Sequence, residues 1–341
     1  MRYTFLNFTQ RMLRHRSPSP LLTSFVFLFV MIFVLTQLIP GPYPPFCRNY
    51  FENNSYLWLE EIRSRGGSEI NRFKYIFNPR GMCKTSSKVL LLLVLVKSKA
   101  GNFRKRRYIR DTWGKDARKR GYKVAFLLGY SKLDKVFVDY ENEFYGDVIQ
   151  QDFRESYHNN THKIKMVFDW VVNYCKRAQY IIIVDDDMYL NIQNAVGYIS
   201  QAGVGEDRYL YSGYFLQEPL PDRYVKSKHY ISKEQYPFDC YPPYIAGACI
   251  FLNQHAVQGF YGVLPYIPYF PFDDVFIGFL AQILRIKPLS NNLIKLEGTP
   301  LHIDEINEIK CIISQHGYNV DSMFYIAYNS THSQFSAVEN S

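Results

Sequence analysis

Eight consecutive apolar residues, from Val89 to Val96, constrain the fold of this chain more than any other feature. A strand whose side chains are all apolar must be covered on both faces, which is typical of parallel or mixed sheets with helices on either side. Two shorter apolar segments, Val124–Leu128 and Tyr180–Val184, have the same character. We therefore expect an α/β domain with a mostly parallel central sheet.

The segment before the third apolar strand predicts a helix. Its apolar residues recur at helical spacing and form one stripe of an amphipathic helix, at Ile164, Val167, Phe168, Val171 and Cys175. Lys163 and Lys165 lie near the start of this helix. Alternation of strands with helices places functional sites at the carboxyl ends of the strands.

Three carboxylates, Asp185, Asp186 and Asp187, follow the third apolar strand directly. Adjacent carboxylates repel one another unless a cation neutralises them, and hard oxygen ligands suit Mg²⁺ or Mn²⁺ shared with a diphosphate. Two other interpretations of the triplet remain open, a solvated acidic turn and a phosphohydrolase whose first Asp is the nucleophile. Such hydrolases usually carry Thr or Val at the position of Tyr189. The loop pattern of an EF-hand is absent.

A basic run, Arg104–Arg107 with Arg110, follows the first apolar strand. At a helix start, these guanidinium groups are suited to nucleotide phosphates, and a solvated basic face is the alternative. The net charge of +9 divides into +5 in residues 1–51, +9 in residues 97–120 and −5 elsewhere. A general groove for nucleic acid is therefore disfavoured.

An uncharged segment of 19 residues, Leu21–Ile39, is long enough as a helix to cross a hydrocarbon core of ~30 Å. Four arginines precede it, so the positive-inside rule places the N-terminus in the cytosol. We predict a cytosolic tail (1–20), a transmembrane signal anchor (21–39), a proline-containing stem (40–82) and a lumenal catalytic domain (83–341). A cleaved signal peptide is the alternative, but no small-x-small cleavage pattern follows the segment.

All six cysteines lie beyond this segment, where disulfides are permitted. Three glycosylation sequons lie on the same side, beginning at Asn53, Asn159 and Asn329. A fourth, at Asn7, would be cytosolic. Together these features predict the secretory pathway.

Five blocks, in order along residues 88–280, resemble the β1,3-glycosyltransferase family, which includes β1,3-galactosyl- and N-acetylglucosaminyltransferases. The blocks are Lys97–Phe103 with Arg106, Ile109-Arg110 and Thr112–Gly114; Tyr145–Phe153 with Ser156-Tyr157; Asp185–Asp187; Tyr241–Tyr244 with Gly247; and Asp273–Gly278. Details at Asp273, Ala246–Ala248, Gly298–Pro300 and His316-Gly317 look closest to the Brainiac-like branch, which extends glycolipids.

The resemblance implies a GT-A fold, Mn²⁺, a UDP-sugar donor and inversion at the anomeric carbon. It also implies a glycolipid or glycoprotein glycan as acceptor and a location in the Golgi membrane. N-acetylglucosamine, galactose and N-acetylgalactosamine remain open as donor sugars. The alternative from another class is a non-catalytic, sugar-binding membrane protein on a transferase fold.

By family position, Asp187 and His316 are the expected metal ligands, with His302 in reserve for the histidine. The expected nucleotide-binding residues are Lys97, Arg106, Arg110, Asp185 and Asp186, with a role in shaping the turn as the alternative for Asp186. Asp274 is the expected catalytic base, supported by Asp273, although this pair would also suit the N-cap of a helix beginning at Val275. His316 would otherwise be an ordinary surface histidine. Tyr241 and Tyr244 are candidates for stacking on sugar rings or for ordinary packing.

Overall fold

The computed structural model describes Cys47 and residues 57–67, 72–84, 90–202, 209–216, 220–296, 306–319 and 321–332. The chain divides into two compact units, Met1–Asn49 and Tyr50–Ser341, and the fold below is that of the second. The predicted anchor at 21–39, Asn53 and His302 lie outside the described residues. Within the described ranges, no helix is both long and apolar enough to cross a bilayer.

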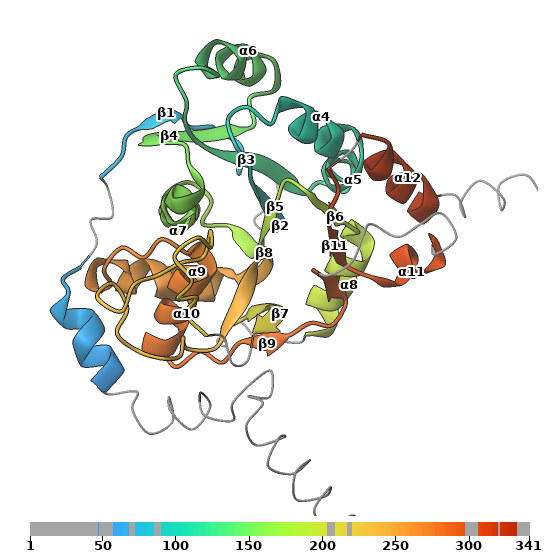
Figure 1. The fold of residues 1–341 in the computed structure, drawn as a ribbon. Helices are drawn as coiled ribbons and strands as arrows, with labels where there is room; N and C mark the ends of the chain where they lie inside the picture. The colour runs from blue at the N-terminus through green and yellow to red at the C-terminus, as the bar shows by residue number, and fades with distance from the viewer. Residues whose placement is uncertain are drawn as a thin grey trace, which may run out of the picture. The chain divides into compact units, whose positions relative to one another are not determined.

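A mixed sheet of eight strands forms the centre of the described part of the Tyr50–Ser341 unit (Figure 1). Its strands in spatial order are β1 (Tyr75–Phe77), β4 (Val148–Arg154), β3 (Lys123–Tyr130), β2 (Leu90–Lys97), β5 (Ala178–Asp185), β8 (Tyr244–Asn253), β7 (Tyr211–Leu216) and β9 (Leu289–Ser290). The strands β4, β3, β2 and β5 are parallel, whereas β1 runs antiparallel to β4, and β8 runs antiparallel to both β5 and β7. The expected parallel sheet therefore forms the centre, and antiparallel pairs extend it on both sides.

A second, smaller sheet lies at the end of β5. Its strands in spatial order are β10 (Ile294–Lys295), β11 (Ser314–His316) and β6 (Met188–Leu190). Because only Asp186 and Asp187 separate the end of β5 from the start of β6, this small sheet holds the turn that carries the Asp triplet.

Helices cover both faces of the large sheet (Figure 1). On one face lie α4 (Phe103–Asp111), α5 (Trp113–Lys119), α8 (Ile192–Gln201) and α12 (Asp321–His332). On the other lie α7 (Asn160–Tyr174), α9 (Gln254–Val263) and α10 (Asp273–Ile283). The remaining helical segments are 57–64, α6 (Lys135–Tyr145), α11 (Ile306–Cys311) and the 3₁₀ turns η1 (Tyr157–Asn159) and η2 (Leu264–Tyr266).

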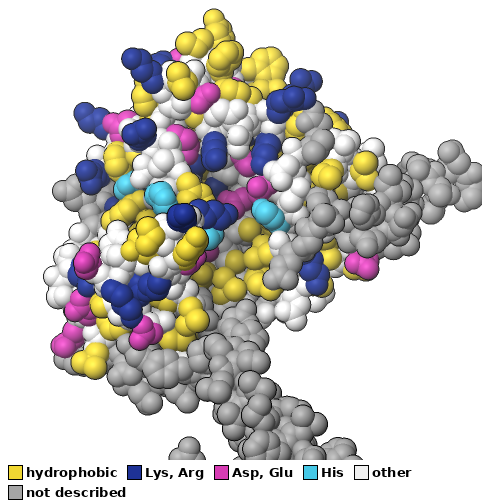
Figure 2. All heavy atoms as spheres, viewed as in Figure 1, with side chains coloured by type: hydrophobic (Ala, Val, Ile, Leu, Met, Phe, Trp, Pro, Cys, Tyr) yellow, Lys and Arg dark blue, Asp and Glu magenta, His cyan; other side chains and the backbone are white. Residues whose placement is uncertain are grey.

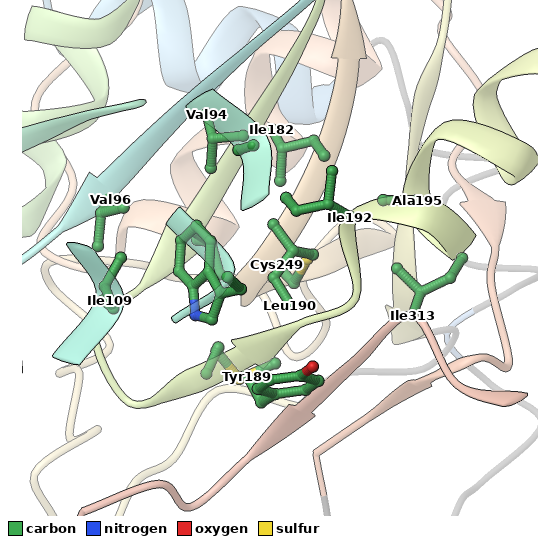
Figure 3. Close-up of a cluster of buried hydrophobic side chains, with 14 of the residues drawn as sticks. Val94, Val96, Ile109, Ile182, Tyr189, Leu190, Ile192, Ala195, Cys249 and Ile313 are labelled. Atoms are coloured by element: carbon green, nitrogen blue, oxygen red, sulfur yellow. The ribbon is translucent and has the colours of Figure 1, made fainter. Parts of the chain in front are cut away.

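The central strand β2 is buried on both faces, as its sequence predicts. Val94 and Val96 point into a core cluster shared with helices α4 and α8 (Figure 3). Leu93 and Leu95 alternate with them and are also fully buried. Because successive strand residues point to opposite faces, β2 contributes to a core on each side of the sheet.

Helix α7 is more enclosed than its single apolar stripe predicts. Lys163 is buried, and its Nζ donates to the Ser98 carbonyl at 2.8 Å and to Glu155 Oε1 at 2.7 Å. Lys165 is also buried. The predicted helix is therefore confirmed, and its polar start is buried together with its apolar stripe.

The folded domain begins earlier than the predicted boundary at residue 82. Trp58 is fully buried, donates a hydrogen bond to the Tyr236 hydroxyl at 3.1 Å and packs edge-on against Phe279. Strand β1 pairs with β4 at the edge of the large sheet. Residues 57–67 and 72–82 therefore belong to the domain and not to an extended stem.

A disulfide joins Cys83 to Cys175, close to the end of α7. Cys249 is free and buried, and Cys311 is free and exposed. Of the sequon asparagines, Asn329 is exposed on α12, and the Asn159 amide donates to the Arg154 carbonyl. Glycosylation of either residue stays a prediction.

Candidate active site

The Asp triplet lies at the carboxyl end of β5, next to the carboxyl end of its parallel neighbour β2. Asp185 is the last residue of β5, and Asp186 and Asp187 form the turn that leads into β6. The backbone N–H of Asp186 donates to the Lys97 carbonyl, which fixes this turn against the end of β2. The three side chains point to different partners, so their roles differ.

Asp186 points inward and is held by hydrogen bonds. Its Oδ2 accepts from the Ser98 hydroxyl at 2.7 Å and from the Asn102 amide at 2.8 Å. Lys105 Nζ lies 3.4 Å from its other oxygen, and the residue is buried. The expectation that Asp186 binds nucleotide does not agree with this position, because its carboxylate is already used to hold the turn.

Asp187 faces His316 across the small sheet. His316 ends β11, which pairs with β6, and its Nε2 lies 3.6 Å from Asp187 Oδ1. The N–H groups of Gly317 and Tyr318 donate to the Asp187 carbonyl. Gly317 has a φ of +105°, a backbone conformation that favours glycine, so the His316-Gly317 pair suits this tight approach.

The environment of Asp187 keeps its carboxylate charged. Burial acts to raise the pKa of Asp187, but the interaction with His316 and the charge of Lys105 outweigh it and hold the pKa below its usual range. The same interaction with Asp187 raises the pKa of His316. Asp187 Oδ1 is nevertheless buried without a hydrogen-bond partner in the described part of the chain.

An orphaned carboxylate oxygen beside an imidazole fits a divalent cation. The described residues contain no group of three or more His, Cys, Asp or Glu side chains arranged to hold a metal. A cation at Asp187 and His316 would therefore take its remaining ligands from water and from a bound substrate. Mn²⁺ and Mg²⁺ accept such mixed oxygen shells in phosphate-binding sites.

Lys97 links the triplet to the start of α10. Its buried Nζ lies 3.1 Å from Asp185 Oδ1 and 2.6 Å from Asp273 Oδ2. Burial acts to lower the pKa of Lys97, but Asp185 and Asp273 outweigh it and raise the pKa, so the ammonium stays charged. Asp185 keeps about a third of its side chain exposed and can still meet a ligand.

Asp273 and Asp274 begin α10 but do not cap it. The helix starts at Asp273 and its N-cap residue is Phe272, so the alternative of an N-cap pair before a helix beginning at Val275 is wrong. Asp274 Oδ1 accepts from the Val275 N–H at 2.8 Å, and Oδ2 accepts from the Gly247 N–H at 3.4 Å. Both carboxylates complement the positive end of the helix dipole.

Burial raises the pKa of Asp274 to about 6, and the charge of Asp273 adds to this rise. A carboxylate with this pKa is ionised at neutral pH and accepts a proton more readily than an ordinary Asp. Gly247 leaves room for the side chains of Lys97 and Asp274, because a Cβ at this position would lie 3.3 Å from Lys97 Nζ and 3.4 Å from the Asp274 Cβ.

A cavity of about 380 Å³ opens beside Asp274. Aromatic side chains form much of its wall, at Tyr157, Tyr241, Tyr244 and Phe272. Asp222 and His229 add polar groups. The Tyr241 hydroxyl is buried without a hydrogen-bond partner among the described residues, although its ring packs against Tyr236. The cavity therefore combines flat apolar walls with a few polar groups.

Arg106 and Arg110 lie inside an ion-pair network and do not face the cavity. Arg106 is fully buried and bonds Glu141 Oε2 at 2.6 Å, the carbonyls of residues 99 and 100, and the Ser98 hydroxyl. Arg110 forms two hydrogen bonds with Asp147 and one with Glu141. The expectation that both bind nucleotide phosphates is therefore replaced by a structural role, in which Arg106 supports Ser98.

Lys105 is the basic residue that reaches the Asp cluster. Its Nζ lies 3.5 Å from Asp187 Oδ2 and donates to Asn319 Oδ1 at 2.9 Å. Helical spacing gave no signal for this, because Lys105 lies four residues before the buried Ile109 and Arg106 lies three residues before it, so both fall on the same side of the helix. Asn102, which holds Asp186, had no recognisable signal of its own.

Comparison with known proteins identifies the family of this chain. The Galactosyltransferase family model matches residues 104–292. The chain is 31% identical over 237 residues to "Beta-1,3-galactosyltransferase brn" of Drosophila melanogaster, covering 68% of this chain and 73% of that protein. It is also 31% identical to "Lactosylceramide 1,3-N-acetyl-beta-D-glucosaminyltransferase B" of Danio rerio, covering 73% and 67%.

A third relative is "UDP-GalNAc:beta-1,3-N-acetylgalactosaminyltransferase 1" of Rattus norvegicus, which is 31% identical over 281 residues and covers 80% of this chain and 82% of that protein. The three relatives carry three different sugars in their names and share the β-1,3 linkage. The region matched by the family model contains the Asp triplet and the start of α10. The chain therefore belongs to the galactosyltransferase family of β-1,3-glycosyltransferases.

Proposed function

We propose that this protein is an inverting, Mn²⁺-dependent β1,3-glycosyltransferase with the GT-A fold. It transfers N-acetylglucosamine, galactose or N-acetylgalactosamine from a UDP-sugar to a glycolipid or glycoprotein glycan. The observation that carries the proposal is the path Asp185–Lys97–Asp273, which joins the Asp187–His316 pair to the cavity at Asp274. Such a path brings a diphosphate site and a basic carboxylate to one reaction centre.

On the donor side, Asp187 Oδ1 and the His316 imidazole would hold the cation together with the diphosphate oxygens. When bound, the cation would neutralise the negative charge that develops on UDP as it leaves. Lys105 adds a positive charge 3.5 Å from Asp187, and the exposed part of Asp185 is placed to contact the nucleotide. Asp186 keeps this turn rigid through Ser98 and Asn102.

On the acceptor side, Asp274 acts as the base. Its carboxylate takes the proton from an acceptor hydroxyl as that oxygen forms a bond to the anomeric carbon. The bond from this carbon to the UDP oxygen breaks at the same time, and UDP keeps the electron pair. Attack from the face opposite UDP inverts the anomeric configuration, by the logic of inverting glycoside hydrolysis with a sugar hydroxyl in place of water.

The cavity beside Asp274 is suited to the acceptor sugar. The rings of Tyr157, Tyr244 and Phe272 offer apolar surface for a sugar face. The Tyr241 hydroxyl, which has no hydrogen-bond partner among the described residues, would donate to one of its oxygens. Polar groups that would be buried unpaired without the right ligand give strong discrimination between acceptors.

The proposed location is the Golgi membrane, with the catalytic domain in the lumen. It is supported by the charge asymmetry around Leu21–Ile39 and by the sequons beyond this segment. Addition of protease to sealed microsomes should leave the catalytic domain intact. Digestion of the domain in that experiment would contradict the orientation.

The transferase proposal is tested by measuring UDP release from each UDP-sugar with glycolipid and glycoprotein acceptors. Release should require both an acceptor and Mn²⁺ and should stop when a chelator is added. Sugar binding without UDP release would favour the non-catalytic alternative. Release of inorganic phosphate from a phosphomonoester would favour the phosphohydrolase alternative, in which Asp185 is the nucleophile.

A further inference from the structure

Helix α6 presents a row of apolar side chains outward. Leu133, just before the helix, and four residues within it recur at helical spacing on one side of α6, and we call them the α6 stripe: Leu133, Val136, Phe137, Tyr140 and Phe144. Each of them is between 60 and 91% exposed. Hydrophobic side chains gather over α6 in the space-filling view (Figure 2). An apolar stripe normally faces a core, so outward exposure of this stripe indicates an interaction surface.

The other side of α6 is fixed to the domain. Val138 is buried in a small core with Leu128 and Val148. Glu141 pairs with Arg106 and Arg110, and Gly146 ends the helix in the left-handed conformation. The helix therefore has its inner face occupied, and burial of the α6 stripe against the rest of the domain would require these contacts to break.

The charges beside the α6 stripe nearly balance. Lys135 and Asp139 form an ion pair with each other on the helix. Lys132 adds one positive charge, and Asp134 and Glu143 add two negative charges, so the net charge of these five side chains is −1. A rim with so little net charge suits an uncharged or zwitterionic surface better than a strongly basic or acidic partner.

The size of the α6 stripe argues against a stable protein interface. At about 200 Å² for each large side chain, the exposed part of the stripe amounts to roughly 700 Å² at most. A stable interface buries about 800 Å² on each partner and usually spans more than one helix. Shallow insertion into a lipid surface has no such minimum, and aromatic side chains are enriched at the membrane interface.

We propose that the α6 stripe lies on a lipid surface, with its apolar side chains ~5–10 Å deep at the boundary between headgroups and acyl chains. This inference deepens the proposed function and rests on it, because a glycolipid acceptor would bring the enzyme to a bilayer. Phe137 packs on Phe103, and Asn102 bonds Asp186. Contact through the α6 stripe would therefore hold the donor site in one orientation relative to the membrane.

The test uses the full chain in phosphatidylcholine nanodiscs, with a polarity-sensitive fluorophore on a single introduced cysteine. The exposed Cys311 is first replaced by Ser so that it does not take the label. The label is placed at the two ends of the α6 stripe, by Leu133→Cys and Phe144→Cys. Lys287→Cys is the matched control, because Lys287 is also exposed but lies outside the stripe. Lipids carrying a doxyl quencher are then added.

We expect quenching at both stripe positions and little at the control, with a shallow doxyl group quenching more than a deep one. A stripe label that stays water-exposed and unquenched would overturn the proposal. A label that is shielded from water but not quenched would assign the stripe to a protein partner or a second copy, and would also overturn it. Both replaced residues are at least 80% exposed, so neither change removes a core contact.

The quenching measurement is independent of catalysis. UDP release is measured on the same nanodiscs, so the two proposals can fail separately. Quenching without transferase activity would leave the lipid contact standing and remove only the proposed function. Transferase activity without quenching would remove only the lipid contact.

Discussion

Replacement of Asp274 by Asn separates its catalytic role from its structural one. Asn is similar in size, and its side-chain oxygen can still accept from the Val275 and Gly247 N–H groups, as the carboxylate does. An amide cannot take the proton of the acceptor hydroxyl. Base catalysis is typically worth 10²–10⁴-fold, so we expect Asp274→Asn to lower kcat by about that factor. UDP binding should be retained, because Asp274 is not among the proposed ligands of the diphosphate.

The same substitution should change stability in a direction set by pH. Burial raises the pKa of Asp274 to about 6 in the folded protein, whereas an unfolded Asp titrates near 3.9. The folded wild type therefore binds this proton more tightly than the unfolded chain and loses stability as pH rises from about 4 to about 6. A difference of about two pKa units corresponds to about 3 kcal/mol as an upper bound. Asn does not titrate and avoids this loss.

We therefore expect the variant to gain stability relative to wild type between pH 4 and pH 6, and to keep that gain, up to about 3 kcal/mol, at pH 7.5. Urea denaturation at several pH values measures the difference, and a transfer assay with UDP titration measures rate and binding. Wild-type kcat/KM should rise with pH through about 6 and then level off. Near-wild-type turnover of Asp274→Asn would refute the base assignment. A stability difference that does not change with pH would refute the buried, titrating carboxylate.

Three further substitutions test the rest of the site. His316→Ala should raise the Mn²⁺ concentration needed for half-maximal activity by at least 10–100-fold, measured by metal titration, and an unchanged requirement would remove His316 from the metal site. Lys97→Met should lower the free energy of unfolding, measured by urea denaturation, by about 3–5 kcal/mol, because the partly buried carboxylates of Asp185 and Asp273 lose their counter-ion. A loss below about 1 kcal/mol would contradict the bridging role of Lys97. Arg110→Met should lower the free energy of unfolding by about 3 kcal/mol, because Asp147 and Glu141 lose their guanidinium partner. The UDP affinity of the folded variant should stay unchanged, and a reduced UDP affinity would restore the nucleotide-binding role of Arg110.

The features predicted best from the sequence are the central strands and the position of the Asp triplet at the end of one of them. The apolar runs at Val89–Val96, Val124–Leu128 and Tyr180–Val184 correspond to β2, β3 and β5. An unbroken apolar run specifies burial on both faces by itself, so it depends little on the rest of the chain. The Asp triplet could be placed at the end of a strand for the same reason.

Partners that lie far apart in the chain could not be predicted. Lys97 meets Asp273 across 176 residues, and no local pattern specifies that contact. The basic run predicts that Arg110 is a phosphate ligand, but in the fold its guanidinium forms ion pairs with Asp147 and Glu141. The position of Trp58 in the folded domain depends on Tyr236, which lies 178 residues away. Long-range pairing of this kind requires the fold to be known.

The antiparallel strand β8 could not be predicted from the sequence either. Its ten residues pair with both β5 and β7, and in this position Gly247 leaves the space in which Lys97 and Asp274 approach each other. Gly247 stood out in the family blocks, but its role depends on side chains from β2 and α10. Resemblance therefore identified the residue, and the structure supplied the physical reason for it.

The stereochemistry of transfer tests the central claim most directly. The protein is incubated with an α-linked UDP-sugar, Mn²⁺ and a glycan acceptor, and the new linkage is determined by NMR spectroscopy. The proposed role of Asp274, as a base on the face opposite UDP, predicts a β-configured product, and the relatives' shared linkage predicts attachment at position 3. The product should form only when donor, acceptor and Mn²⁺ are all present. An α-linked product would require attack from the same face as UDP and would contradict the proposed mechanism, and UDP release without any glycosidic product would contradict the transferase assignment.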